Sequence, residues 1–196
     1  MLEVTVDTDQ EQQVSWLRRV ALGDEDAFTQ IFKHYESERR LWRYLYRLLQ
    51  DSHRADELFV EVMFEVWKNA ASFAGKAKPS TWVFGIAHNR AMTALRIRKP
   101  WEALGWNDAD YDPHESCRLE AEQDQDRLGK CLRQAVDVLS QKHKEVVYLY
   151  LEDFSVREIA MIVGCNEGTV KSRMFHARKH LKMKLSLLGI TEYPLP

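Results

Sequence analysis

The sequence predicts an all-α fold in which two small helical domains are joined by an acidic, flexible linker and the C-terminal domain is a helix-turn-helix. Apolar residues recur at three- and four-residue spacing over most of the chain, and no stretch shows the alternation typical of a strand. Acidic residues gather between the two periodic parts. A chain of 196 residues is long enough for two small cores. We expect residues 1–100 and 124–196 to form the domains and residues 101–123 to form the linker.

The N-terminal domain is expected to contain four helices, which cover about residues 12–22, 24–49, 51–73 and 80–99. Gly23 is a plausible stop for the first helix, and Asp24 is a suitable N-cap for the second. The apolar face of the third helix consists of Leu58, Val62, Val66 and Trp67. We expect Pro100 to end the fourth helix, because proline interrupts helical hydrogen bonding.

Helical periodicity returns at about residues 123–138 and 140–152, and a helix-turn-helix pattern follows. Ser155 and Glu158 have the spacing of a capping box at the start of the first helix of this motif. Gly164 permits the positive φ of a tight turn, and Asn166 can cap the second helix. These signals place the start and the end of each helix within a few residues.

The second helix of the motif has one apolar row and a basic outer face. The apolar row consists of Val170, Met174, Ala177, Leu181, Leu185 and Leu188. At about 100° per residue, the residues off this row are Lys171, Ser172, Phe175, Arg178, Lys179 and Lys182. An exposed ring among cations suits a surface that reads base edges and contacts phosphates. The alternative is that Phe175 covers a neighbouring element and the cations form a solvated face.

A second basic and aromatic stretch lies in the N-terminal domain, around the fourth helix and the loop before it. Its members are Lys76, Lys78, Arg90, Arg96, Arg98 and Lys99, with Phe73, Trp82 and Phe84. Bases stack on aromatic rings and phosphates follow cationic paths, so this pattern suits single-stranded DNA. The alternative is that Trp82 belongs to the core.

Composition and residue spacing exclude several other classes. No apolar run approaches the roughly 20 residues of a membrane helix, and the N-terminus is acidic, so we expect a cytoplasmic protein without membrane insertion. The three cysteines show no C-x-x-C pair, which indicates reduced thiols. His114 with Cys117, and His176 with His180, offer too few ligands to indicate a metal site. No nucleophile-base pair or phosphate loop indicates an enzyme or a cofactor.

Four blocks of the chain together resemble the bacterial extracytoplasmic-function (ECF) sigma factors. In order, they are "ALGDEDAFTQIFKHY", "DELFVEVMFEVW", "STWVFGIAHNRAMTALR" and "EIAMIVGCNEGTVKSRMFHARKHL". The resemblance implies a non-catalytic protein that binds core RNA polymerase, directs it to promoter DNA and has an anti-sigma factor as a further partner.

The resemblance also implies three sets of site residues. Docking on core polymerase maps to Asp56, Glu57, Leu58, Glu61 and Val62. Melting of the minus-10 element maps to Lys78, Ser80, Thr81, Trp82, Asn89 and Arg90. Reading of the minus-35 element maps to Lys171, Ser172, Arg173, Phe175 and Arg178, to which helical geometry adds Lys179.

The chain departs from the family pattern at a few positions. Val60 stands where a glutamine is usual, Gly85 and His88 occupy usual basic positions, and Thr93 replaces an aspartate. These departures affect the expected minus-10 preference more than the class. Two alternatives remain open at this point: a helix-turn-helix activator that does not bind polymerase, and a sigma mimic that sequesters an anti-sigma factor.

Overall fold

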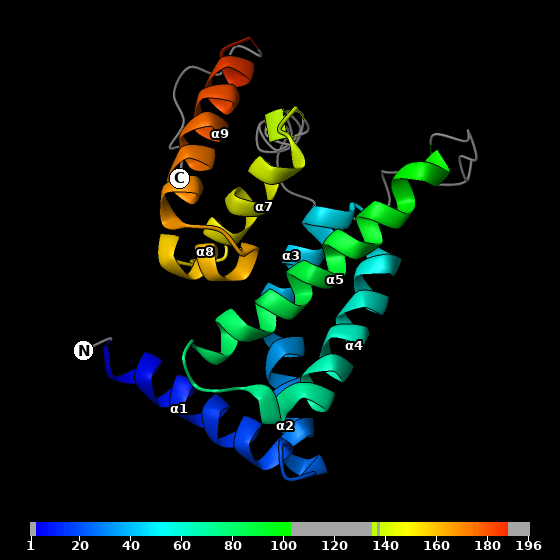
Figure 1. The fold of residues 1–196 in the computed structure, drawn as a ribbon, viewed down its shortest axis with the longest axis vertical. Coiled ribbons are helices and arrows are strands. Elements are labelled where there is room, and N and C mark those ends of the chain that lie inside the picture. Colours follow the sequence, from blue (N-terminus) through cyan, green and yellow to red (C-terminus); the bar gives the residue numbers. More distant parts are fainter. Residues whose placement is uncertain (1–2, 103–134, 137, 188–196) are drawn as a thin grey trace, which may run out of the picture. The chain divides into compact units, whose positions relative to one another are not determined.

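The computed structural model describes residues 3–102, 135–136 and 138–187 (Figure 1). The chain divides into two compact units with a boundary between residues 98 and 99, and residues 161–164 group with the first unit. Most of the predicted linker, 101–123, and its boundary with the second domain lie outside the described residues. No helix in these described ranges is long and apolar enough to cross a membrane.

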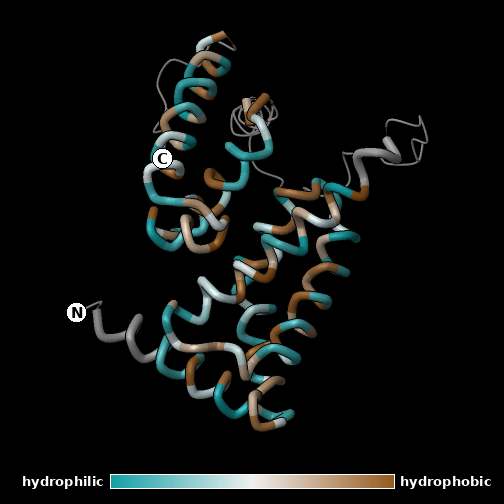
Figure 2. Tube along the Cα trace, in the orientation of Figure 1, coloured by the Kyte–Doolittle hydropathy of each residue, from teal (hydrophilic) through white to brown (hydrophobic). Residues whose placement is uncertain are grey.

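The N-terminal unit is built of helices, as the sequence predicts. Its elements are α1 (Glu3–Val20), α2 (Glu25–Glu38), α3 (Arg40–Leu49), α4 (Ser52–Asn69), the 3-10 turn η1 (Ala70–Ser72) and α5 (Pro79–Glu102). Helix α1 packs on α2, and α3 packs on α4. Apolar residues recur along the helices at intervals of about one turn (Figure 2), which is the pattern that buries one side of each helix.

Capping side chains set the starts of α2 and α4. The backbone N–H of Ala27 donates to Asp24 Oδ1 at 2.9 Å, and that of Arg54 donates to Asp51 Oδ1 at 3.0 Å. Two hydrogen bonds hold the pKa of the Asp24 carboxyl below its ordinary value. The larger effect comes from the N–H of Ala27, and the next from the side chain of Arg19. Gly23 has φ +86°, which fits its predicted role as the stop after α1.

The predicted single helix over residues 24–49 is wrong, because Arg39 interrupts it. Arg39 adopts a left-handed backbone with φ 54°, which ends α2 at Glu38 and starts α3 at Arg40. The apolar stripe steps by six residues from Tyr35 to Leu41, and a continuous α-helix would place these two side chains on different faces. The break lets both segments bury their apolar sides.

The predicted stop at Pro100 is also wrong, since α5 continues to Glu102. Proline fixes φ near the helical value, so its cost lies in one missing hydrogen bond and a clash with the preceding turn. The 24 residues of α5 continue past that position.

The core of the N-terminal unit is mainly apolar and also holds a buried pair of polar side chains. Its most deeply buried side chains include Leu17, Ile31, Leu41, Tyr44, Leu45, Val62, Met63 and Phe84. Tyr44 Oη and His88 Nδ1 lie 3.0 Å apart in this core, and His88 is only 5% exposed. His88, which occupies a usual basic position of the family, is therefore an interior side chain here.

A smaller polar cluster links α1 to α2. The hydroxyl of Tyr35 donates to Gln13 Oε1 at 3.0 Å, and Gln13 Nε2 lies 3.0 Å from His34 Nε2. Burial raises the pKa of the Tyr35 phenol, so it keeps its proton and acts as the donor. His34 also lies 3.9 Å from Asp9 and 3.6 Å from Glu38, which gives its ring two carboxylate neighbours.

The described C-terminal helices are α7 (Gln141–Tyr150), α8 (Val156–Val163) and α9 (Glu167–Leu187), and α7 packs on α9. The predicted capping box is confirmed: the backbone N–H of Ser155 donates to Glu158 Oε2 at 2.8 Å, and the N–H of Glu158 donates back to Ser155 Oγ at 3.3 Å. Gly164 has φ +67°, and Asn166 Oδ1 accepts from the N–H of Thr169 at 2.7 Å. The helix-turn-helix therefore forms with the predicted caps and turn.

Candidate nucleic-acid interface and docking surface

The outer face of α9 carries the residues predicted to read DNA. Val170, Met174, Ala177, Leu181 and Leu185 are buried, as the apolar row predicts. Lys171, Ser172, Arg178 and Lys179 are exposed, and Arg173 is half-buried. The side chain of Phe175 is 65% exposed, so it does not cover a neighbouring element of its own unit. The helix thus presents one ring among cations to solvent.

Ring contacts hold part of this face in place. Phe175 meets His176 edge-on with ring centres 5.5 Å apart. The guanidinium of Arg178 lies 5.9 Å from the ring centre of Tyr150, which comes from α7. These contacts favour a surface whose side chains are partly ordered before a ligand arrives.

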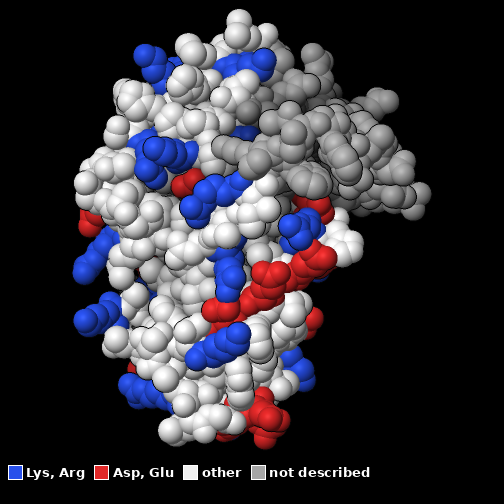
Figure 3. All heavy atoms as spheres, turned by 45° about the vertical axis from the view of Figure 1, so that its right-hand side comes forward, with Lys and Arg blue, Asp and Glu red and all other residues white. Residues whose placement is uncertain are grey.

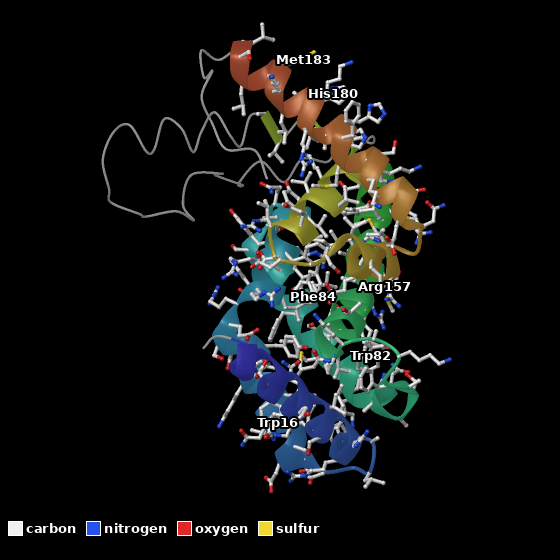
Figure 4. The ribbon with its side chains drawn as sticks, turned by 90° about the vertical axis from the view of Figure 1, so that its left-hand side faces the viewer. Trp16, Trp82, Phe84, Arg157, His180 and Met183 are labelled. Atoms are coloured by element: carbon white, nitrogen blue, oxygen red, sulfur yellow. The ribbon has the colours of Figure 1, made fainter. Side chains whose placement is uncertain are left out.

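Three histidines meet beside this face, and sequence reasoning found only two of them together. His143 on α7 has its ring centre 6.4 Å from that of His176 and 5.9 Å from that of His180. Figure 4 labels His180 on α9. Burial, then the neighbouring His180, His176 and Arg173, lower the pKa of His143. The third ring comes from a segment more than 30 residues away, so spacing along one helix could not reveal it.

The predicted polymerase-docking residues separate into an exposed and a buried set. Asp56, Glu57 and Glu61 are exposed on α4. Leu58 is 6% exposed and Val62 is fully buried, so these two side chains belong mainly to the core of the unit. The reason is helical geometry, because both lie on the apolar stripe that packs inside the unit.

Two exposed apolar residues on α4 were missed as candidates. Val60 is 57% exposed and Phe64 is 54% exposed, one turn apart. The ammonium of Lys68 lies 4.1 Å from the Phe64 ring centre. The signal was present in the sequence, because Val60 and Phe64 lie off the buried stripe at i and i+4.

The charges on and around α4 are mixed. The face drawn in Figure 3 carries a row of carboxylates bordered by Lys and Arg side chains. Arg54 pairs with Glu57 at 3.0 Å, and Arg90 of α5 pairs with Glu65 of α4. A groove of about 190 Å³ lies between these helices, with Leu49, Arg54, Glu57, Leu58, Glu61, Arg90, Thr93, Ala94 and Ile97 as its lining.

The predicted minus-10 residues lie at the start of α5 and along it, with different exposures. Lys78 and Asn89 are exposed, whereas Ser80 and Arg90 are half-buried. Thr81 is 3% exposed and its hydroxyl has no hydrogen-bond partner in the described part of the chain, so it is not at the surface. The minus-10 set is therefore only partly accessible.

The aromatic residues of this stretch divide in the same way. Trp82 is half-buried, with its ring centre 5.5 Å from that of Phe73 and the planes tilted by 57°. Phe84 is 1% exposed and packs on Tyr44, so its predicted place in a nucleic-acid surface is wrong. Trp82 and Phe84 both lie on the first turns of α5 (Figure 4). Trp82 with Phe73 is the aromatic pair that remains near the surface.

Two parts of the chain match families of the sigma-70 class. Sigma-70 region 2 matches residues 34–100, and Sigma-70 region 4 matches residues 129–181. The chain belongs to the ECF RNA polymerase sigma factors. It is 31% identical over 153 residues to the ECF RNA polymerase sigma factor SigL of Mycobacterium tuberculosis (strain ATCC 25618 / H37Rv), covering 77% of this chain and 85% of SigL. It is 28% identical over 181 residues to SigW of Bacillus subtilis (strain 168), covering 86% of this chain and 94% of SigW.

Two solved structures share the fold. CnrH in complex with the cytosolic domain of CnrY matches with a TM-score of 0.66 and 16% identity, over 90% of this chain and 98% of CnrH. The sigma factor RpoE in complex with the anti-sigma factor NepR, from Bartonella quintana, matches with a TM-score of 0.61 and 24% identity, over 79% of this chain and 98% of RpoE. At these identities the likeness concerns the fold alone.

Proposed function

We propose that this protein is an alternative sigma factor that binds core RNA polymerase and directs transcription initiation at a defined set of promoters. The observation that carries the proposal is the outer face of α9. Within the part of the chain that matches Sigma-70 region 4, this face presents Lys171, Phe175 and Arg178 opposite a buried row. Such a protein has no catalytic step of its own and acts in the cytoplasm.

In this proposal α9 enters the major groove of the minus-35 element. Its first turns carry Lys171, Ser172 and Arg173, which lie where recognition helices contact base edges. Arg178 and Lys179 follow further along and are placed to meet phosphates. Phe175 offers an apolar edge that can meet a thymine methyl or a sugar.

The start of α5 acts on the minus-10 element. Melting exposes unpaired bases, and a base outside its stack needs a flat apolar surface and hydrogen-bonding groups at its edge. Trp82 with Phe73 provides the ring surface, while Lys78 and Ser80 next to it in the sequence, and Asn89 and Arg90 about two turns further along α5, provide polar groups. Thr81 is buried, so its side chain is not part of this surface.

Helix α4 docks on core polymerase through its exposed side. Asp56, Glu57 and Glu61 supply carboxylates for a basic partner surface, and Val60 with Phe64 supplies an apolar centre. Leu58 and Val62 act indirectly by packing α4 into the unit.

An anti-sigma factor is the proposed regulator. The RpoE structure contains an anti-sigma factor, and the CnrH structure contains the cytosolic domain of CnrY. A regulator of this kind would compete with polymerase if it covered the exposed apolar pair Val60 and Phe64.

The test is reconstituted transcription with core polymerase, this protein and genomic DNA fragments, with run-off products mapped to their start sites. The expected result is a small set of discrete transcripts that require the protein and share two upstream elements. Duplex binding without any transcript would support the activator instead. Loss of both, with capture of an anti-sigma factor, would support the sigma mimic.

A further inference from the structure

We infer that His143, His176 and His180 form a binding site for a divalent transition-metal ion of the Co²⁺ to Zn²⁺ group, which would link α7 to α9. His176 and His180 are spaced i and i+4 on α9, the spacing at which two histidines on one helix face chelate one ion. His143 reaches the same place from α7. The inference departs from the sequence-based expectation of no metal, because packing supplies the third ligand.

The rings approach, without yet matching, the separation that a bound ion requires. With metal–nitrogen bonds of about 2.0–2.1 Å and tetrahedral angles, three imidazoles on one ion have ring centres about 5 Å apart. The ring centre of His143 lies 5.9 Å from that of His180 and 6.4 Å from that of His176. Closing about 1–1.5 Å is within reach of a change of side-chain torsion, since His176 and His180 are exposed.

The chemistry of the three side chains fits this class of ion. Neutral imidazole is a ligand for Zn²⁺, Cu²⁺ and Ni²⁺, whereas Mg²⁺ and Ca²⁺ require oxygen ligands. Three protein ligands leave a fourth position open for water or a further ligand.

In the described residues the ligand atoms of Asp9, His34 and Glu38 lie within 4.8 Å of one another, closer than those of the three histidines, but the chemistry of this group suits a transition-metal ion less well. Its single imidazole already has a carboxylate near each ring nitrogen, at 3.9 Å and 3.6 Å, and Gln13 lies at 3.0 Å from Nε2. The contact with Gln13 gives one ring nitrogen of His34 a hydrogen-bond partner and joins α1 to α2. This group therefore serves as the competing site that the experiment must separate.

The test is titration of the purified full chain with Zn²⁺ by calorimetry and with Co²⁺ by visible absorption. The compared proteins are wild type, His143→Gln, His180→Gln, His34→Gln and His53→Gln. His53 is exposed on α4 and serves as the matched control. We expect one equivalent to bind wild type, with affinity reduced at least about tenfold in His143→Gln and in His180→Gln and unchanged in the other two variants. Circular dichroism checks that each variant is folded.

Three results would overturn the inference. The first is the absence of one-equivalent binding to wild type. The second is undiminished binding to both His143→Gln and His180→Gln, or loss of binding in His34→Gln alone. The third is a Co²⁺ complex with thiolate charge-transfer absorption, which would assign the ion to cysteine. A rise in the unfolding temperature on addition of Zn²⁺ that His143→Gln abolishes would support the link between α7 and α9.

Discussion

The indole Nε1 of Trp42 donates a 2.6 Å hydrogen bond to Asp56 Oδ1 and so joins α3 to the exposed side of α4. The Trp42 ring stacks on Tyr46 with the planes 3° apart, and the Arg39 guanidinium lies 4.4 Å from its centre. These contacts fix the ring that carries the donor. The carboxylate of Asp56 is therefore oriented before a partner binds.

Removing this donor tests whether an oriented Asp56 contributes to polymerase docking. Trp42→Phe keeps a ring on Tyr46 and loses only the N–H. A hydrogen bond to a charged group contributes about 1.5–3 kcal/mol to stability, and only the part that orients Asp56 affects binding, so we expect affinity for core polymerase to fall about fivefold. The measurement is fluorescence anisotropy of labelled protein with core polymerase. Trp16→Phe on α1 is the control, and equal affinity of the two variants would contradict the role of Asp56.

The buried stripe of α4 shows which predictions could be made from sequence. Helical periodicity placed Leu58 and Val62 on the apolar face, while family resemblance assigned the same residues to polymerase docking. The structure agrees with the periodicity, because both side chains are buried. The caps of α8 and α9 were also predicted residue by residue, since capping depends on side chains three positions apart.

Features that depend on tertiary packing or on a single backbone state were not predictable in this way. Arg39 gave no glycine or proline signal for the break between α2 and α3. His143 lies more than 30 residues from His176, so only the packing of α7 on α9 brings their rings together. Local periodicity carries no information about the histidine contact, and for the helix break it offers only the six-residue step from Tyr35 to Leu41.

The cations of α9 predict a change in the salt dependence of promoter binding. A contact between a cation and a phosphate releases bound counterions, so each lost contact lowers the slope of log K against log salt concentration by about one unit. We expect Lys171→Ala and Arg178→Ala each to show this decrease when holoenzyme binding to promoter duplex is measured between about 50 and 200 mM salt. Lys33→Ala on α2 should leave the slope unchanged. Unaltered slopes in both α9 variants would show that these two cations face solvent and do not contact phosphates.

Phe175 and its neighbour Met174 should behave in opposite ways when replaced by alanine. Phe175 is 65% exposed, so Phe175→Ala should change the free energy of unfolding by less than about 0.5 kcal/mol. Met174 is 5% exposed, and Met174→Ala should lower that free energy by about 2–5 kcal/mol. Urea unfolding followed by circular dichroism gives both values.

The same Phe175→Ala variant should also discriminate less between promoters. If the ring contacts a thymine methyl, the affinity should fall about fivefold or more, and only for duplexes that carry thymine at one position of the minus-35 element. Holoenzyme binding to duplexes that vary one position at a time measures this loss. A uniform loss over all positions would assign the ring to the sugar-phosphate backbone, and no loss at all would remove it from the interface.

Trp82 predicts a separation between promoter binding and promoter opening. Its ring packs on Phe73 at the start of α5, within the segment proposed to hold unpaired bases. Stacking of a base on an aromatic ring contributes about 1–3 kcal/mol, so Trp82→Ala should reduce the opened fraction about tenfold and leave minus-35 duplex binding unchanged. Permanganate reactivity of minus-10 thymines measures opening. Trp82→Phe, which keeps a ring, should restore most of it, and equal loss of binding and opening would place Trp82 in the core.

Glu145 predicts how the stability of the C-terminal unit changes with pH. It is 7% exposed on α7, and burial raises the pKa of its carboxyl above the ordinary 4.5, opposed by the charges of Arg173 and Lys142. The folded chain then binds more protons than the unfolded chain between these two pKa values, so the free energy of unfolding falls as pH rises above about 4.5. Glu145→Gln cannot ionise and should gain stability relative to wild type over this range, while the difference stays constant at lower pH. Urea unfolding followed by circular dichroism from about pH 4 to pH 8 tests this prediction. The control is Glu36→Gln, at an exposed position on α2. Parallel pH profiles of Glu145→Gln and wild type would show that the protonation of the Glu145 carboxyl does not change on folding.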